Sequence, residues 1–152
     1  MIYTPMTKKA MQIAYEAHHG QVDKAGLPYI FHPFHLAESM TDEDCTVVAL
    51  LHDVAEDTDW TIEALAEEGF NKNVLIALKL LTHDPSESYM DYISRLSTCD
   101  IARRVKIADL RHNLDQSRIA HPDEKVKKRW KKYAQALRLL EAIRVVSRMK
   151  TK

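Results

Sequence analysis

Apolar side chains recur along this chain at the three- and four-residue spacing of an α-helix. Residues 71–81 show the pattern clearly, with Val74, Ala77, Leu78 and Leu81 on one face. No segment shows convincing strand alternation, and three glycines in 152 residues are too few for a turn-rich β fold. The sequence therefore predicts an all-α fold of about seven or eight helices.

Capping residues indicate where these helices begin and end. Thr41 or Asp42 can cap the third helix, Asn71 or Asn73 can cap the fifth, and Gly20 can end the first. A chain of 152 residues can bury one proper core, so we expect a single domain over residues 1–152. The expected helices cover residues 4–19, 33–40, 42–58, 61–68, 71–81, 86–96, 100–114 and 123–149.

Charge and composition exclude several classes of protein. The 22 basic and 22 acidic residues give no net charge, so binding to nucleic acid is unlikely even though residues 125–132 are basic. No apolar run approaches the length of a membrane span, and residues 1–11 lack a signal pattern. Cys45 and Cys99 lie far apart and are expected to be free thiols. These features favour a cytoplasmic protein, and they do not indicate an oligomeric state.

The segment from Leu50 to Thr58 has the most unusual charge pattern. Read as one helix, it places apolar residues on one face and His52, Asp53, Glu56 and Asp57 on the other. No lysine or arginine lies between residues 41 and 60, so the like charges repel by ~0.2–0.5 kcal/mol per pair. They also lie near the negative end of the helix dipole. A divalent cation would relieve both penalties, whereas the alternative is an ordinary solvated helix face.

Two further residues could belong to a site. His32 precedes Pro33 at the start of a helix, where a histidine often serves as a cap or a core hydrogen-bonding group. Asp109 follows an apolar run, with Asn113 one turn later on the same face. Composition and spacing alone do not connect either residue with His52 and Asp53.

A family resemblance makes that connection. His32, the pair His52-Asp53 and Asp109 resemble the H…HD…D signature of HD-superfamily metal-dependent phosphohydrolases. Four blocks, over residues 17–21, 26–33, 50–58 and 105–113, resemble the hydrolase domain of RelA/SpoT-type proteins, which handle the alarmone (p)ppGpp. The resemblance covers about residues 8–140 and implies a single helical HD domain. Because no synthetase or regulatory region is present, the resemblance is specifically to the stand-alone small alarmone hydrolases.

The resemblance implies a role for each matching position. His32, His52, Asp53 and Asp109 would together bind one divalent metal. The ion that the resemblance implies is Mn²⁺. Glu56 and Asp57 match the acidic pair that the family uses in hydrolysis. Asn113 and Tyr133 match positions that contact the nucleotide. Candidate cations for substrate phosphates are Lys24, Lys106 and Arg111, which could equally be surface residues.

These expectations favour a metal-dependent nucleotide phosphohydrolase, most closely a guanosine-3′,5′-bis(diphosphate) 3′-pyrophosphohydrolase. One position differs from the family. Asp23 stands where alarmone hydrolases usually have a basic residue that helps to hold the guanine nucleotide. An acid there would repel phosphate, so we expect Asp23→Arg to lower the KM for ppGpp, unless Lys24 compensates. The alternatives are an HD-domain phosphatase for another nucleotide and a non-catalytic nucleotide-sensing module.

Overall fold

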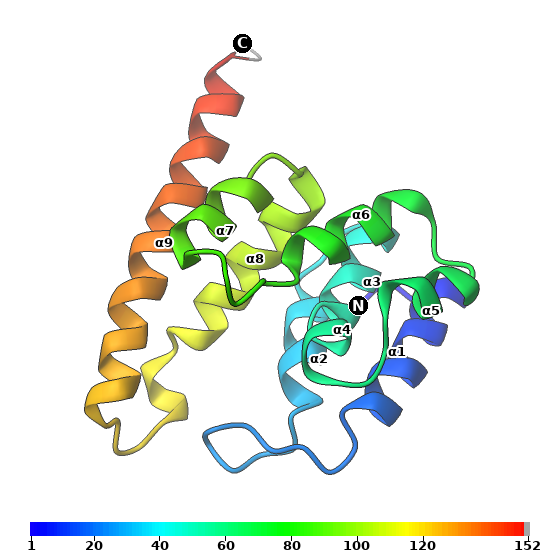
Figure 1. Cartoon of the computed structure of the whole chain (residues 1–152), viewed down its shortest axis with the longest axis horizontal. Coiled ribbons are helices and arrows are strands. Elements are labelled where there is room, and N and C mark those ends of the chain that lie inside the picture. The colour runs from blue at the N-terminus through cyan, green and yellow to red at the C-terminus, as the bar shows by residue number, and fades with distance from the viewer. Residues whose placement is uncertain (151–152) are drawn as a thin grey trace.

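The computed structural model describes residues 1–150, with side chains up to residue 143, and its regular structure is helical (Figure 1). An isolated β-bridge joins Val22 and Pro28 in the loop before the second helix. The all-α prediction is confirmed. The helices are α1 (Pro5–Ala17), α2 (Phe31–Glu38), α3 (Glu43–Leu51), α4 (Val54–Asp57), α5 (Ile62–Glu67), α6 (Lys72–Leu81), α7 (Tyr89–Leu96), α8 (Asp100–Asn113), the 3₁₀ helix η1 (Gln116–Arg118) and α9 (Glu124–Lys150).

Helix α3 forms the centre of the core. Every residue from Cys45 to Leu51 is buried, because α3 packs against α1, α2, α6 and α8. A helix enclosed in this way is apolar on all sides. Each fully buried leucine or valine contributes about 1.5–3 kcal/mol relative to an exposed one. The packing of α3 therefore fixes where its C-terminal end, at Leu51, meets α2 and α8.

The prediction of one continuous helix through residue 58 is wrong. Helix α3 ends at Leu51, His52 and Asp53 form a turn, and α4 begins at Val54. His52 Nδ1 lies 2.7 Å from the Ala49 carbonyl, the acceptor that the Asp53 amide would use in a continuous helix. Asp53 has ψ −3°, which directs the chain away from the helix axis. As a result His52 is buried and does not share an exposed face with Glu56 and Asp57.

The other predicted helices agree closely with the structure. Asp42 caps α3 by accepting from the Cys45 amide at 2.8 Å, and Asn71 caps α6 by accepting from the Val74 amide at 3.0 Å. All four residues predicted to face inward on α6 are buried. The second helix begins at Phe31, so that Pro33 lies in its first turn, where a missing amide proton costs nothing.

The loop over residues 18–30 extends toward the segment that joins α8 to α9 (Figure 1). Gly20 and Gly26 both have positive φ, at 83° and 82°, a conformation that glycine adopts without strain. Within the loop, Asp23 Oδ1 accepts from the amides of Ala25 at 2.9 Å and Leu27 at 3.0 Å. These hydrogen bonds give the loop a defined shape.

Among the described helices, none combines the length and the apolar character needed to cross a membrane. Cys45 and Cys99 are both free thiols, as expected from the sequence.

Candidate active site

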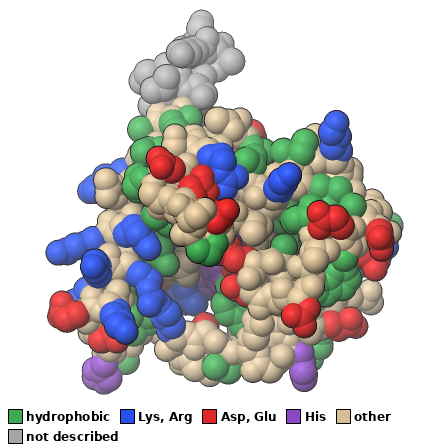
Figure 2. Space-filling model, viewed as in Figure 1, with side chains coloured by type: hydrophobic (Ala, Val, Ile, Leu, Met, Phe, Trp, Pro, Cys, Tyr) green, Lys and Arg blue, Asp and Glu red, His purple; other side chains and the backbone are tan. Residues whose placement is uncertain are grey.

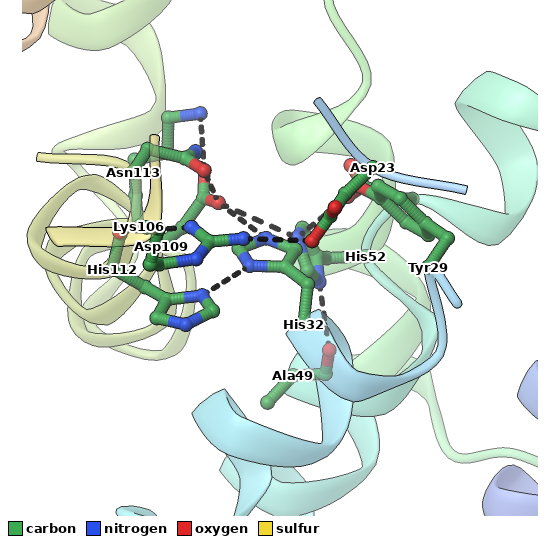
Figure 3. A network of polar contacts seen from close by, with 11 residues as sticks. Asp23, Tyr29, His32, Ala49, His52, Lys106, Asp109, His112 and Asn113 are labelled. Atoms are coloured by element: carbon green, nitrogen blue, oxygen red, sulfur yellow. Dashed lines mark hydrogen bonds and ion pairs between the residues drawn. The ribbon is translucent and has the colours of Figure 1, made fainter. Parts of the chain in front are cut away.

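Three polar side chains from separate helices meet in the interior. His32 comes from α2, His52 follows α3, and Asp109 comes from α8. All three are buried, and one potential ligand atom from each lies within 4.8 Å of the others. His32 Nε2 is 2.9 Å from Asp109 Oδ1, and His52 Nε2 is 3.7 Å from the same oxygen. The structure thus assembles three of the four predicted metal ligands in one cluster (Figure 3).

Both imidazole rings are oriented from outside the cluster. His52 Nδ1 donates to the Ala49 carbonyl, and His32 Nδ1 lies 2.7 Å from His112 Nδ1. Burial, and then the neighbouring His32 and Arg118, lower the pKa of His112 to about 4, so His112 is neutral and can accept from His32. These contacts direct both Nε2 atoms toward the centre, as second partners do for metal-binding histidines.

The cluster suits a divalent cation. His52 Nε2 is buried and makes no hydrogen bond of acceptable geometry, although Asp53 Oδ2 lies 3.0 Å away. A buried polar atom without a partner costs about 1–3 kcal/mol. Two imidazole nitrogens and a carboxylate are ligands that Mn, Fe and Zn accept. The chemistry of these donors therefore fits a metal, without selecting which one.

Asp53, the fourth predicted ligand, lies beside the cluster. Its Oδ2 accepts a hydrogen bond from the Tyr29 hydroxyl, a contact that sequence reasoning missed. Burial, and then the charge of Asp53, raise the pKa of Tyr29 well above its usual value, so the phenol keeps its proton and remains a donor. Tyr29 therefore holds the Asp53 side chain in place.

Asp109 is held as a carboxylate by its own helix. Lys106 Nζ lies 2.8 Å from Asp109 Oδ2, and Asn113 Nδ2 donates to Oδ1 at 3.0 Å. Burial alone would raise the pKa of Asp109, but the charge of Lys106 and the hydrogen bond from His32 hold it well below its usual range. Lys106 thus neutralises a buried acid, whatever its relation to substrate.

Lys106→Met is expected to destabilise the metal-free protein by about 3–5 kcal/mol, because it leaves a buried carboxylate without its counter-charge. Saturating Mn²⁺ should restore part of this loss, since a cation at the cluster would take over that role. Urea unfolding in EDTA and in Mn²⁺ measures both values. Lys79→Met, at an exposed lysine of α6, should change the free energy of unfolding by less than about 0.5 kcal/mol. An equally small effect for Lys106→Met would contradict the assigned role.

Two cavities adjoin the cluster. We call the first the loop cavity; it has about 310 Å³ and is lined by the 18–30 loop, η1 and α9, including Asp23, Lys24, Arg118, Arg129 and Trp130. We call the second the acid cavity; it has about 290 Å³ and includes Asp53, Glu56, Asp109, Lys106 and Lys132. Tyr29, Asn113 and Tyr133 line both. The two cavities are therefore adjacent halves of one larger site.

The remaining predicted residues are Glu56, Asp57 and Arg111, and only Glu56 lines one of the two cavities. Glu56 lines the acid cavity, and partial burial, followed by the charges of Asp53 and Asp57, raises its pKa. Asp57 is exposed, and its pKa is raised by partial burial and by Asp53. Arg111 lies outside both cavities and pairs with Glu141 of α9 at 2.7 Å. We therefore leave Arg111 out of the proposed substrate-binding set.

Several residues of the site were not selected from the sequence. Tyr29 and His112 lie inside the blocks that resemble the family, so attention to those blocks could have found them. Trp130 and Lys132 lie in the basic run 125–132, which the sequence suggested only as a nucleic-acid surface and a weak one. Trp130 Nε1 donates to the Asn113 carbonyl at 3.0 Å, and Lys132 Nζ lies 4.5 Å from the centre of the Tyr89 ring.

The structure gives Asp23 a cationic partner that the sequence did not indicate. Arg118 Nη2 donates to Asp23 Oδ2 at 3.2 Å, and Asp23 Oδ1 is occupied by two loop amides. An arginine at position 23 would lose those hydrogen bonds and face Arg118 with a like charge. We therefore now expect Asp23→Arg to weaken nucleotide binding, the reverse of the expectation from the sequence.

Comparisons with known proteins identify similar sequences and one solved structure of similar fold. No protein-family model matches the chain. The chain is 34% identical over 128 residues to the guanosine-3′,5′-bis(diphosphate) 3′-pyrophosphohydrolase of Haemophilus influenzae, covering 74% of this chain and 19% of that protein. It is 31% identical over 133 residues to the bifunctional (p)ppGpp synthase/hydrolase SpoT of Escherichia coli, covering 78% and 19%. A probable GTP pyrophosphokinase of Mycobacterium leprae is 32% identical over 136 residues, covering 81% and 17%.

These three relatives are much longer, and the chain spans only 17–19% of their length. Among solved structures, a metazoan ortholog of SpoT that hydrolyses ppGpp superposes with a TM-score of 0.73 at 24% identity, covering 90% of this chain and 85% of the other. That similarity establishes a shared fold.

Proposed function

We propose that this chain, a homologue of the ppGpp hydrolase domains of SpoT and RelA proteins, is itself a metal-dependent (p)ppGpp 3′-pyrophosphohydrolase. The observation that carries the proposal is the buried cluster of His32, His52 and Asp109 beside a cavity that also contains Glu56. A nucleotide-sensing module would not need a proton-transfer group next to such a cluster. The compact relative with the same fold, which hydrolyses ppGpp, supports activity in a chain of this size.

In this proposal His32, His52 and Asp109 bind the metal, Asp53 completes the set, and Mn²⁺ is the physiological ion. When bound, such a cation lowers the pKa of water and polarises a phosphoryl oxygen. Tyr29 and His112 orient Asp53 and His32 through the contacts described above. Lys106 and Asn113 do the same for Asp109.

Glu56 is the proposed proton-transfer group. It lines the acid cavity, and its raised pKa brings it closer to the range in which a carboxyl group exchanges protons near neutral pH. Water would attack the phosphorus that is bonded to O3′ of the ribose, the P–O3′ bond would break, and O3′ would take up a proton. The products of ppGpp would be GDP and pyrophosphate. Asp57, close to Glu56, assists by raising the pKa of Glu56.

The two cavities suit the two ends of this substrate. We propose that the guanosine lies in the loop cavity near Trp130 and Lys24, since bases stack on aromatic rings. The 3′-diphosphate would lie in the acid cavity, with Lys132 as its counter-charge. Asn113 and Tyr133, which line both cavities, would contact the ribose between them.

The surface of α9 supports a highly charged substrate. Basic side chains gather over this helix on the left of Figure 2, next to a hollow in which histidine is visible. Lys125, Lys128, Lys131 and the two cavity residues Arg129 and Lys132 make up this surface. In a chain without net charge, such a local concentration of basic side chains attracts polyanions toward the cavities.

We also propose that the chain forms a single domain and is located in the cytoplasm. The free thiols are consistent with that location.

Incubation of Mn²⁺-loaded protein with ppGpp tests the function directly. We expect GDP and pyrophosphate as the products, identified by mass and by ³¹P NMR, and no turnover after treatment with EDTA. GTP and GDP, which lack a 3′-diphosphate, are the controls and should remain intact. Release of phosphate from another nucleotide, with ppGpp untouched, would instead identify a phosphatase of different specificity. Binding without any turnover would identify a sensing module.

A further inference from the structure

Asp23 and Arg118 form an ion pair at the wall of the loop cavity. The two residues are 95 positions apart in the chain, and Arg118 Nη2 lies 3.2 Å from Asp23 Oδ2. Both line the cavity, and their side chains are only 10% and 22% exposed. Pairs this well enclosed hold their geometry better than exposed pairs do. The pair is therefore a fixed part of the cavity wall.

Asp23 uses most of its hydrogen-bonding capacity within the protein. One oxygen accepts from the amides of Ala25 and Leu27, and the other accepts from Arg118. Its role is to join the 18–30 loop to η1 and to orient the guanidinium. Asp23 is in this sense a positioning residue.

Arg118 retains capacity to bind. An arginine has five N–H donors, and the structure uses one on Asp23 and one, from Nη1 at 2.9 Å, on the His112 carbonyl. Hydrogen bonds from both Nη1 and Nη2 restrain the guanidinium plane, so the N–H groups that remain have restricted directions. A pre-oriented guanidinium loses less entropy on binding than a free one.

We propose that Arg118, oriented by Asp23, selects guanine over adenine in the loop cavity; this rests on the proposed function. Guanine presents two acceptors, O6 and N7, on one edge, and arginine recognises this pair through two N–H groups. Adenine presents an amino group in place of O6, which would face the donors of Arg118. The indole of Trp130 is held by its hydrogen bond to the Asn113 carbonyl and supplies a surface on which the base can stack.

The cation at this wall of the cavity is Arg118, which comes from η1. Its partner is Asp23 of the 18–30 loop, which orients the guanidinium. Because Arg118 compensates the negative charge of Asp23, the acid is compatible with an anionic ligand.

Binding of GDP and ADP to the Mn²⁺-loaded protein, measured by calorimetry and by tryptophan fluorescence, tests the proposal without relying on turnover. The natural protein should bind GDP at least ~10-fold more tightly than ADP. Arg118→Ala should reduce that ratio to below ~3, by weakening GDP alone, and Arg118→Lys should restore only part of it. Asp23→Asn keeps an acceptor for the loop amides and should reduce the ratio several-fold. It should have no further effect when Arg118 is already alanine.

Asp42 and Arg104 provide a matched control. Asp42 also accepts from a backbone amide and pairs with a distant arginine, at 2.9 Å, but this pair lies outside both cavities. Arg104→Ala should leave the GDP-to-ADP ratio unchanged, and thermal unfolding reports the stability of every variant.

An unchanged ratio in Arg118→Ala, or an equal loss of GDP and ADP affinity, would overturn the proposal. The second result would mean that Arg118 holds a group common to both nucleotides. Turnover of ppGpp is measured separately. If the natural protein prefers GDP through Arg118 but does not cleave ppGpp, the proposed function fails and the assignment of Arg118 stands.

Discussion

His52→Ala is expected to remove the bound metal and to lower the turnover of ppGpp by about 10³-fold or more, since a catalytic cation contributes several kcal/mol to the barrier. His52 supplies the buried nitrogen that has no hydrogen-bond partner in the cluster, and its ring is aimed by the Ala49 carbonyl. Alanine removes the nitrogen and leaves His32 and Asp109 as an incomplete set.

Elemental analysis after dialysis measures the metal, and far-UV circular dichroism and thermal unfolding measure the fold. His52→Ala leaves the Ala49 carbonyl without its side-chain partner, at a cost of about 1–3 kcal/mol, so a second variant is needed. His52→Asn can still donate to that carbonyl and should keep the stability while losing the metal. His19→Ala, at an exposed histidine, is the control for a general effect of losing imidazole. Full metal occupancy in either His52 variant would exclude His52 as a ligand.

Features set by neighbouring residues could be predicted from the sequence. The start of α6 depends on Asn71 and an amide three residues later, and its buried face depends on a spacing of three and four residues. The start of α3 likewise depends on Asp42 and the amide of Cys45.

The ligand candidates His32 and Asp109 could not be connected in this way, because only the family resemblance linked them with His52. The structure then brought their side chains together.

Features set by contacts between distant segments could not be predicted. The break at His52 arises because its ring turns inward to hydrogen-bond Ala49 and approach Asp109, and periodicity cannot report such a turn. Asp23 looked like an unfavourable acid because Arg118, its partner, lies 95 residues away. Nothing in the sequence around Arg118 indicates that η1 would bring it to the loop. Comparison with the family therefore identified the position of interest, but it could not show the partner that balances its charge.

Glu56→Gln is expected to keep the metal and to slow the turnover of ppGpp by about 10²-fold or more, the usual size of a general acid–base contribution. Glutamine keeps the size and the polarity of the side chain but cannot exchange a proton. Because Glu56 lines the acid cavity and is not part of the buried His32–His52–Asp109 cluster, the KM for ppGpp should change little. A drop in kcat with a constant KM is the expected pattern for a group that acts mainly in the transition state.

Two further variants separate proton transfer from charge. Asp57→Asn removes the neighbouring charge that helps to raise the pKa of Glu56, so it should have a smaller effect, about 10-fold, and shift the pH profile of kcat toward lower pH. The shift is downward because removal of a nearby negative charge makes the ionised form of Glu56 more favourable. Glu63→Gln, at an exposed glutamate of α5, should leave kcat and KM unchanged.

Two outcomes would contradict the role of Glu56. If Glu56→Gln lost metal and activity together, Glu56 would be a metal ligand. If Glu56→Gln kept full activity, Asp57 or water would have to carry the proton.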